Sequence, residues 1–205
     1  MRKLLRNSLL WIIAFTLMWR GDMSIAAAQR ASHEIQTVYT TPDGFLLGPP
    51  VPGAYGTLVR NSHGLTTGVH TTVSSGPGVY SLWWLIYNNP GSCVTYLCTF
   101  DLPDIAVNAT ARVVPGDATN LSAHLSPGGP YSGEVVMGDP ATGLTNIDGA
   151  LVFLIVRYHG PATPGIIQDQ LTRYDGGCPG AGAPCVDEQI IVFPGDCAGA
   201  CAVPF

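Results

Sequence analysis

The sequence predicts an all-β fold: an antiparallel two-sheet β-sandwich of about nine strands with at most one short helix. The apolar runs are short, and they are separated by Gly, Pro, Asn and Ser, which is typical of strands joined by turns. Some runs alternate between apolar and polar residues, as half-exposed strands do. Two others are almost wholly apolar, which favours central strands covered on both faces within two packed sheets.

The alternating runs define strands with one solvent-facing side. In residues 107–113 the odd-numbered positions are Val or Ala and the even-numbered ones are Asn, Thr and Arg, and residues 119–125 alternate in the same way. The one expected helix begins near Pro164, since Pro fits the first turn of a helix, and it ends by Thr172. The expected strands are residues 35–40, 55–60, 65–73, 79–87, 105–114, 119–125, 134–137, 150–158 and 188–193.

The two apolar runs, residues 80–87 and 150–156, are expected at the centre of the fold. Trp83 and Trp84 are adjacent, so their side chains must point to opposite faces of one strand. One ring should fill the core, and the other must be covered by a loop, a neighbouring chain or a ligand.

The end of the Trp-Trp strand is therefore a candidate recognition surface, flanked by the loop of residues 93–98. The alternative is that the two asparagines which follow the strand only shape a turn before Pro90, a common role of Asn. The candidate binding residues are Trp83, Trp84, Asn88 and Asn89.

The chain begins with the features of an export signal. A basic start, an apolar run over residues 8–19 and three alanines at 26–28 predict a signal peptide of residues 1–28, cleaved after Ala28. Arg20 ends the apolar run short of the roughly 20 residues that a membrane-spanning helix needs, so a retained anchor is the lesser alternative. We expect a secreted, periplasmic or cell-envelope protein with no membrane span after signal removal.

The remaining residues, 29–205, suit one domain with a substantial core. They contain five arginines, no lysine and 13 acidic residues, a net charge of −8. Such a chain repels phosphate backbones, whose binding depends on Lys and Arg. Nucleic acids and acidic membrane surfaces are therefore excluded as expected partners.

All six cysteines follow the predicted signal peptide, which indicates disulfides in an oxidising compartment. Six cysteines allow 15 pairings, but pairing between neighbours closes the shortest loops at the least entropic cost. A metal site is the alternative, although no close C-x-x-C pair is present and no histidine stands within ligand spacing of a cysteine. The expected disulfides staple loops and join Cys93 with Cys98, Cys178 with Cys185, and Cys197 with Cys201.

Three histidines are candidate metal ligands. His70 and His124 occupy the polar parity of their strands, and His159 lies at the end of another strand. Convergence of the three on one sheet face would create a copper or zinc site. The alternative is that His159, which precedes Gly160, hydrogen-bonds a turn and that the other two are surface residues.

Several motifs together resemble a family of uncharacterised exported bacterial β-sandwich proteins. They are the Trp-Trp and Asn-Asn-Pro elements of residues 80–90 with Cys93, the segment 122–125, and the His-Gly-Pro-Ala turn within 156–162. The resemblance spans residues 64–193, and the His-Gly-Pro-Ala turn is also distantly similar to chordin-type (CHRD) domains, an extracellular β-sandwich module. It implies a fold and an extracellular location, and it implies no reaction.

These observations favour an exported, non-enzymatic binding or structural module of the cell envelope or extracellular matrix, with another protein or a glycan as partner. The chain has no G-x-S-x-G, H-E-x-x-H or Walker-type lysine motif, so we expect no catalytic residue and no cofactor. The alternative is a copper- or zinc-binding protein, or a metal-dependent enzyme that uses His124 and His159 with Asp101 or Asp104.

Overall fold

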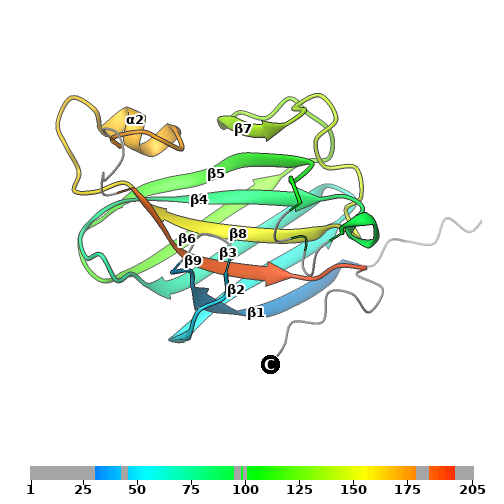
Figure 1. Ribbon diagram of the computed structural model, residues 1–205, viewed down its shortest axis with the longest axis horizontal. Helices are drawn as coiled ribbons and strands as arrows, with labels where there is room; N and C mark the ends of the chain where they lie inside the picture. Colours follow the sequence, from blue (N-terminus) through cyan, green and yellow to red (C-terminus); the bar gives the residue numbers. More distant parts are fainter. Residues whose placement is uncertain (1–30, 43–45, 95–97, 99–100, 179–184, 197–205) are drawn as a thin grey trace, which may run out of the picture.

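The computed structural model describes residues 31–42, 46–94, 98, 101–178 and 185–196 (Figure 1). The predicted signal peptide, residues 1–28, and the predicted Cys197–Cys201 pair lie outside the described residues. Within the described part, no helix is long and apolar enough to cross a membrane.

The prediction of an all-β, antiparallel fold of nine strands is confirmed. Each expected strand is present, and the first two begin earlier than expected, at Ser32 and Pro50. The described residues also form an α-helix, α2 (Ile167–Thr172), and a 3-10 turn, η1 (Pro90–Ser92). The strands are β1 (Ser32–Thr40), β2 (Pro50–Asn61), β3 (Gly64–Thr72), β4 (Gly78–Tyr87), β5 (Ile105–Val114), β6 (Ala118–Leu125), β7 (Val135–Gly138), β8 (Leu151–Tyr158) and β9 (Val186–Phe193).

The strands form one continuous sheet, so the expectation of two separate sheets is wrong. The strand order is β6-β3-β2-β1-β9-β8-β4-β5-β7. The sheet curls into a half-barrel, in which β6, β3 and β2 lie behind β4, β8 and β9 in the view of Figure 1.

The sheet is continuous because β1 pairs with a strand on each of its edges. One edge pairs with β2 from Ser32 to Thr37 and again, after an irregularity, at Tyr39, and the other edge pairs with β9 at Tyr39 and Thr40. Bulges let a strand bend, and the irregularity of β1 lies between Thr37 and Tyr39, where the pairing with β9 begins. β1 therefore links two facing layers, β6-β3-β2 and β9-β8-β4, of one curled sheet.

The inside of the curl holds the main hydrophobic core. Leu58 of β2, Leu65 and Val69 of β3 meet the inward residues of the opposite layer, among which Trp84 and Tyr80 of β4 are the largest. All five are at most 2% exposed. Burial of each such side chain contributes about 1.5–3 kcal/mol, so this cluster is the main reason that the sheet curls on itself.

A second core lies on the outer side of β4, β8 and β9. Trp83 is at its centre, and its ring is fully buried. Tyr174, in the segment after α2, meets the Trp83 ring edge to face with 5.1 Å between centroids. The buried Cys98 packs against the same face. The cover that the sequence required for the second tryptophan is thus a loop of the same chain.

Candidate functional site

No described residue covers the outward side of β1, β2, β3 and β6 in this way, and we call this side the polar face. The strand register arranges its residues in three rows that cross the four strands. The rows are Thr37, Tyr55, His70 and Asn120; Ile35, Thr57, Gly68 and Ser122; and His33, Val59, Thr66 and His124. None of these twelve residues is Asp, Glu, Lys or Arg. Arg112, whose Nη1 donates to Asn120 O at 2.9 Å, borders this face.

A hollow of about 270 Å³ lies in the middle of the polar face, and its lining includes Tyr55, Thr57, His70 and Asn120. The hollow exists because Gly68 has no side chain: an added Cβ would lie 3.2 Å from Thr57 Oγ1 and fill part of the space. Its walls therefore combine an aromatic ring with hydroxyl, amide and imidazole groups, and it is open to solvent.

Tyr55 and His70 form the aromatic wall of the hollow. Their ring centroids are 5.4 Å apart with planes inclined by 33°, and Tyr55 is 46% exposed. His70 Nδ1 lies 2.7 Å from Asn120 Oδ1, so Nδ1 carries the proton and donates it. The other ring nitrogen, Nε2, belongs to a side chain that is exposed on this face of the sheet.

The structure does not bring the three candidate metal ligands together. His70 and His124 lie on the polar face, as their parity predicted, but His70 pairs with Asn120, four residues along β6 from His124. Four residues of a strand span about 13 Å, far beyond the two bonds of about 2 Å each that join two ligands to one metal. His159 is fully buried at the end of β8, on the side of the Trp83 core.

His159 is instead the centre of a buried series of hydrogen bonds. Its Nδ1 lies 3.0 Å from Gly176 O, a carbonyl that can only accept, so Nδ1 carries the proton. Its Nε2 then accepts from the Ser81 hydroxyl at 2.7 Å, and Ser81 Oγ accepts from Trp83 Nε1 at 2.7 Å. Burial lowers the pKa of His159, which favours this neutral form.

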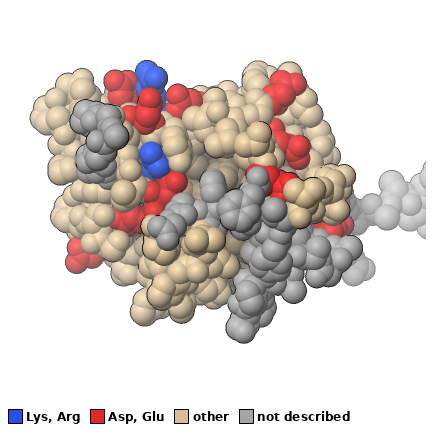
Figure 2. All heavy atoms as spheres, in the orientation of Figure 1, with Lys and Arg blue, Asp and Glu red and all other residues tan. Residues whose placement is uncertain are grey.

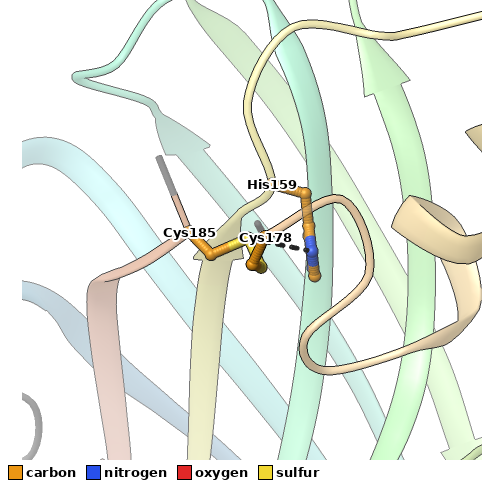
Figure 3. A group of neighbouring side chains, drawn as sticks. All are labelled: His159, Cys178 and Cys185. Carbon is orange, nitrogen blue, oxygen red and sulfur yellow. Dashed lines mark hydrogen bonds between the residues drawn. A yellow bond between two sulfur atoms is a disulfide. The ribbon is translucent and has the colours of Figure 1, made fainter. Parts of the chain in front are cut away.

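Helix α2 and the turn after it hold His159 in place. The Gln170 side chain, buried in α2, donates to the carbonyl oxygens of His159 and Pro161 at 2.9 and 3.0 Å. The chain then turns tightly at Gly176, where a Cβ would collide with the carbonyl oxygen of Asp169. This turn brings Gly176 O and the following Cys178 against the imidazole (Figure 3).

Two of the three predicted disulfides, Cys93–Cys98 and Cys178–Cys185, are confirmed. His159 Nδ1 lies 3.8 Å from Cys185 Sγ, and the ligand atoms of His159, Cys178 and Cys185 all lie within 4.8 Å of one another. The sequence does not reveal that His159 lies beside this disulfide. Helix α2 and its flanking turns separate His159 from Cys178 in the chain, and only their fold brings the two residues together. A histidine that ends a strand before Gly-Pro is the only sequence signal that could have suggested it.

The tryptophans and asparagines named as binding residues occupy different environments. Trp83 and Trp84 are fully buried by the chain itself. Asn88 is half-buried and ties the end of β4 to the loop before β8: its Oδ1 accepts from the amides of Thr145 and Asn146 at 2.8 and 3.1 Å. Asn89 is exposed and precedes η1. Neither tryptophan therefore lies on the surface beside Asn89.

The two aspartates of the alternative enzyme site lie at the far end of β4 from His159. Asp104 Oδ2 accepts from the Asn88 amide at 2.6 Å, and Asp101 stands beside the Cys93–Cys98 disulfide. Ser81, which contacts His159, is seven residues from Asn88, or about 23 Å along the strand. No shared centre of His159 with either aspartate is formed.

No protein-family model, curated protein sequence or solved structure matches this chain. The class of protein that fold and site define is an all-β domain with local disulfides and an uncharged, hollowed sheet face.

Proposed function

We propose that the chain is an exported, non-enzymatic binding module and that its polar face binds an uncharged glycan. The observation that supports this most directly is the hollow beside Tyr55, where an exposed aromatic ring stands among hydroxyl, amide and imidazole groups with no formal charge on the face.

Sugar rings present flat patches of C–H groups together with many hydroxyls. The exposed Tyr55 ring offers an apolar surface for the C–H patches, since Tyr combines an apolar body with a polar tip. Thr57, Asn120 and Ser122 offer donors and acceptors for hydroxyls. A pocket with a few polar groups beside an apolar wall is a common design for small-ligand recognition.

The charge distribution favours a neutral ligand over an anionic one. The chain carries an excess of acidic residues, with a net charge of −5, and Figure 2 shows acidic side chains outnumbering basic ones on the face that it displays. The polar face contributes no Lys or Arg that could offset this. An anionic polymer would therefore be repelled by the molecule without gaining an ion pair on the face.

Export belongs to the same proposal. The two disulfides suggest an oxidising environment outside the cytoplasm, where extracellular polysaccharides also occur. The predicted signal peptide, the resemblance to exported bacterial β-sandwich proteins and the distant similarity to chordin-type domains support the same location.

The test is affinity electrophoresis of the secreted protein in native gels that contain uncharged glucans, mannans or galactomannans, with alginate as an anionic comparison. We expect retardation by at least one uncharged polymer. Tyr55→Ala, which removes the exposed ring, and Gly68→Val, which fills the hollow, should each weaken binding about tenfold or more. Val186→Ala, an exposed site on β9 outside the polar face, is the control.

Two results would overturn the proposal: the absence of retardation in every uncharged polymer, or retardation that Tyr55→Ala and Gly68→Val leave unchanged. Thermal unfolding of both variants identifies any loss of the fold, and a folded Tyr55→Ala protein suffices for the conclusion. Retardation by alginate alone also contradicts a neutral ligand.

A further inference from the structure

The Cys178–Cys185 disulfide has surroundings unlike those of a purely structural bridge. Both cysteines are half-buried, and Cys185 Sγ lies 3.8 Å from the Nδ1–H of His159. The imidazole already donates this proton to Gly176 O at 3.0 Å, so a stronger acceptor that forms at Cys185 could compete for it without movement of the chain.

A surface cavity of about 270 Å³ reaches the other sulfur-bearing residue of the bridge. Its lining consists of Ile166, Asp169, Asp175, Gly177 and Cys178. The cavity therefore touches Cys178, and His159 Nδ1 lies 3.8 Å from Cys185 Sγ, with the ligand atoms of all three residues within 4.8 Å of one another. A sulfur nucleophile would thus reach Cys178 from the cavity, and the departing Cys185 thiolate would lie within reach of the His159 Nδ1–H.

The Cys93–Cys98 disulfide of the same chain has different neighbours among the described residues. Cys98 is fully buried in the outer core, and the group near these two sulfurs is the carboxylate of Asp101, within 4.8 Å. A carboxylate repels a thiolate, whereas an N–H donor stabilises it. The two disulfides thus provide a reactive candidate and an internal reference within one molecule.

We propose that Cys178–Cys185 is a reactive disulfide that undergoes exchange with external thiols. The thiolate of an external thiol bonds to Cys178 Sγ, the Cys178–Cys185 bond breaks, and its electron pair goes to Cys185 Sγ, which accepts the hydrogen bond of His159 Nδ1. A second external thiolate then attacks the external sulfur of the mixed disulfide and releases the Cys178 thiolate. The two protons lost by the external thiols end on Cys178 and Cys185, so two thiols are oxidised to one disulfide while the protein disulfide is reduced to two thiols.

The cavity favours a positively charged thiol. Asp169 and Asp175 lie on its wall, and Arg173 shares the charge of Asp175 from 3.5 Å, so Asp169 is the main acidic group available to a docked cation. The substrate class is therefore a cysteine flanked by basic residues, or a small thiol that carries an amine.

The test uses the folded, oxidised protein with an excess of cysteamine, which is cationic, or of 2-mercaptoethanesulfonate, which is anionic. Timed alkylation and peptide mass spectrometry then give a reduction rate for each disulfide. We expect Cys178–Cys185 to react at least about tenfold faster than Cys93–Cys98 with cysteamine. Asp169→Asn, an exposed change, should remove most of the preference of the Cys178–Cys185 bridge for cysteamine over the sulfonate.

Equal rates at the two bridges, or faster reduction of Cys93–Cys98, would overturn the reactive site. A fast Cys178–Cys185 reaction that Asp169→Asn leaves unchanged would overturn the cationic substrate class alone. The role of His159 has its own readout: in the reduced protein, alkylation of Cys185 should reach half its maximal rate at a pH about one unit below that of Cys93, and an equal or higher pH would contradict it. Glycan binding plays no part in these measurements.

Discussion

Arg60 and Glu34 form an ion pair inside the curl of the sheet, with 2.6 Å between Arg60 Nε and Glu34 Oε1. The Arg60 side chain is only 2% exposed, and its Nη1 also donates to the carbonyl oxygens of Ile147 and Ala150, each at 2.9 Å. One guanidinium therefore connects β1, β2 and the loop before β8, which belong to opposite layers.

Removal of this guanidinium should be among the costliest single changes in the chain. Arg60→Ala leaves one buried carbonyl, one partly buried carbonyl and the partly buried Glu34 carboxylate without their donor, so we expect the free energy of unfolding to fall by about 3–5 kcal/mol. Urea unfolding followed by tryptophan fluorescence measures it. Arg173→Ala is the control, because Arg173 is 55% exposed, and its loss should cost less than about 1 kcal/mol. Equal costs for the two variants would contradict the assigned role of Arg60.

A comparison of Trp83 with Trp84 should measure how much one buried hydrogen bond contributes to stability. Trp83 Nε1 donates to Ser81 Oγ, whereas Trp84 Nε1 is buried and has no partner among the described residues. Trp83→Phe and Trp84→Phe remove similar volumes, so Trp83→Phe should be more destabilising by about 1 kcal/mol. Chemical denaturation of the two variants side by side checks this, and a larger loss for Trp84→Phe would refute it.

The buried His159 should make the protein less stable in mildly acidic solution. Its pKa is lowered in the folded state by burial, so the unfolded chain binds a proton more readily, and stability falls as the pH drops below about 6.5. The charged groups nearest to it, Arg157, Asp175 and Asp187, act in opposing directions and are lesser causes.

The change His159→Gln removes this titrating group. Urea unfolding at pH 7.5 and at pH 5.5 should show a smaller difference for His159→Gln than for the unchanged protein. His63→Gln, a change at an exposed histidine in the β2–β3 turn, should retain the original difference. The assignment fails if His159→Gln keeps the full pH dependence.

Tyr174 should give a second pH dependence, in alkaline solution. Burial, followed by the nearby Asp187 charge, raises its pKa to about 12. The neutral phenol is therefore favoured in the folded state: its contribution is fully present below pH 10 and is lost as the pH rises towards 12. Tyr174→Phe keeps the ring against Trp83 but loses the 2.9 Å hydrogen bond to Asp187 Oδ2.

We expect Tyr174→Phe to cost about 1 kcal/mol at pH 7 and to lose less stability than the unchanged protein between pH 10 and 12. Guanidinium denaturation across this pH range measures both effects. A variant that loses stability as steeply as the unchanged protein would place the alkaline titration elsewhere.

The sequence predicts the strands well because period-two alternation and turn residues are local signals. β5 has the expected bounds, and the two observed disulfides join sequence neighbours as expected. The single sheet was not predictable, because the pairing of β1 with both β2 and β9 is a choice of hydrogen-bonding neighbours that leaves no mark on the apolar pattern.

The candidate sites were predicted less well for a related reason. Parity correctly placed His70 and His124 on an exposed face, but only the register with Asn120 reveals their separation along β6. The hollow likewise needs Tyr55, Gly68 and Ser122 to come together from three strands, which requires the register of every intervening pair. The approach of His159 to Cys185 depends on the path of α2, and this helix is too short to show a helical pattern of apolar residues in the sequence.

The pairing of β1 with β9 joins the first described strand of the chain to the last, at Tyr39 and Ile190. Contacts between residues about 150 positions apart close late, because the loop entropy must be lost before they form. The layer of β2, β3 and β6 can assemble while the chain is still being synthesised. Completion of the domain must wait until β9 has been delivered, so a chain that is cut before residue 186 should leave an incomplete, aggregation-prone edge.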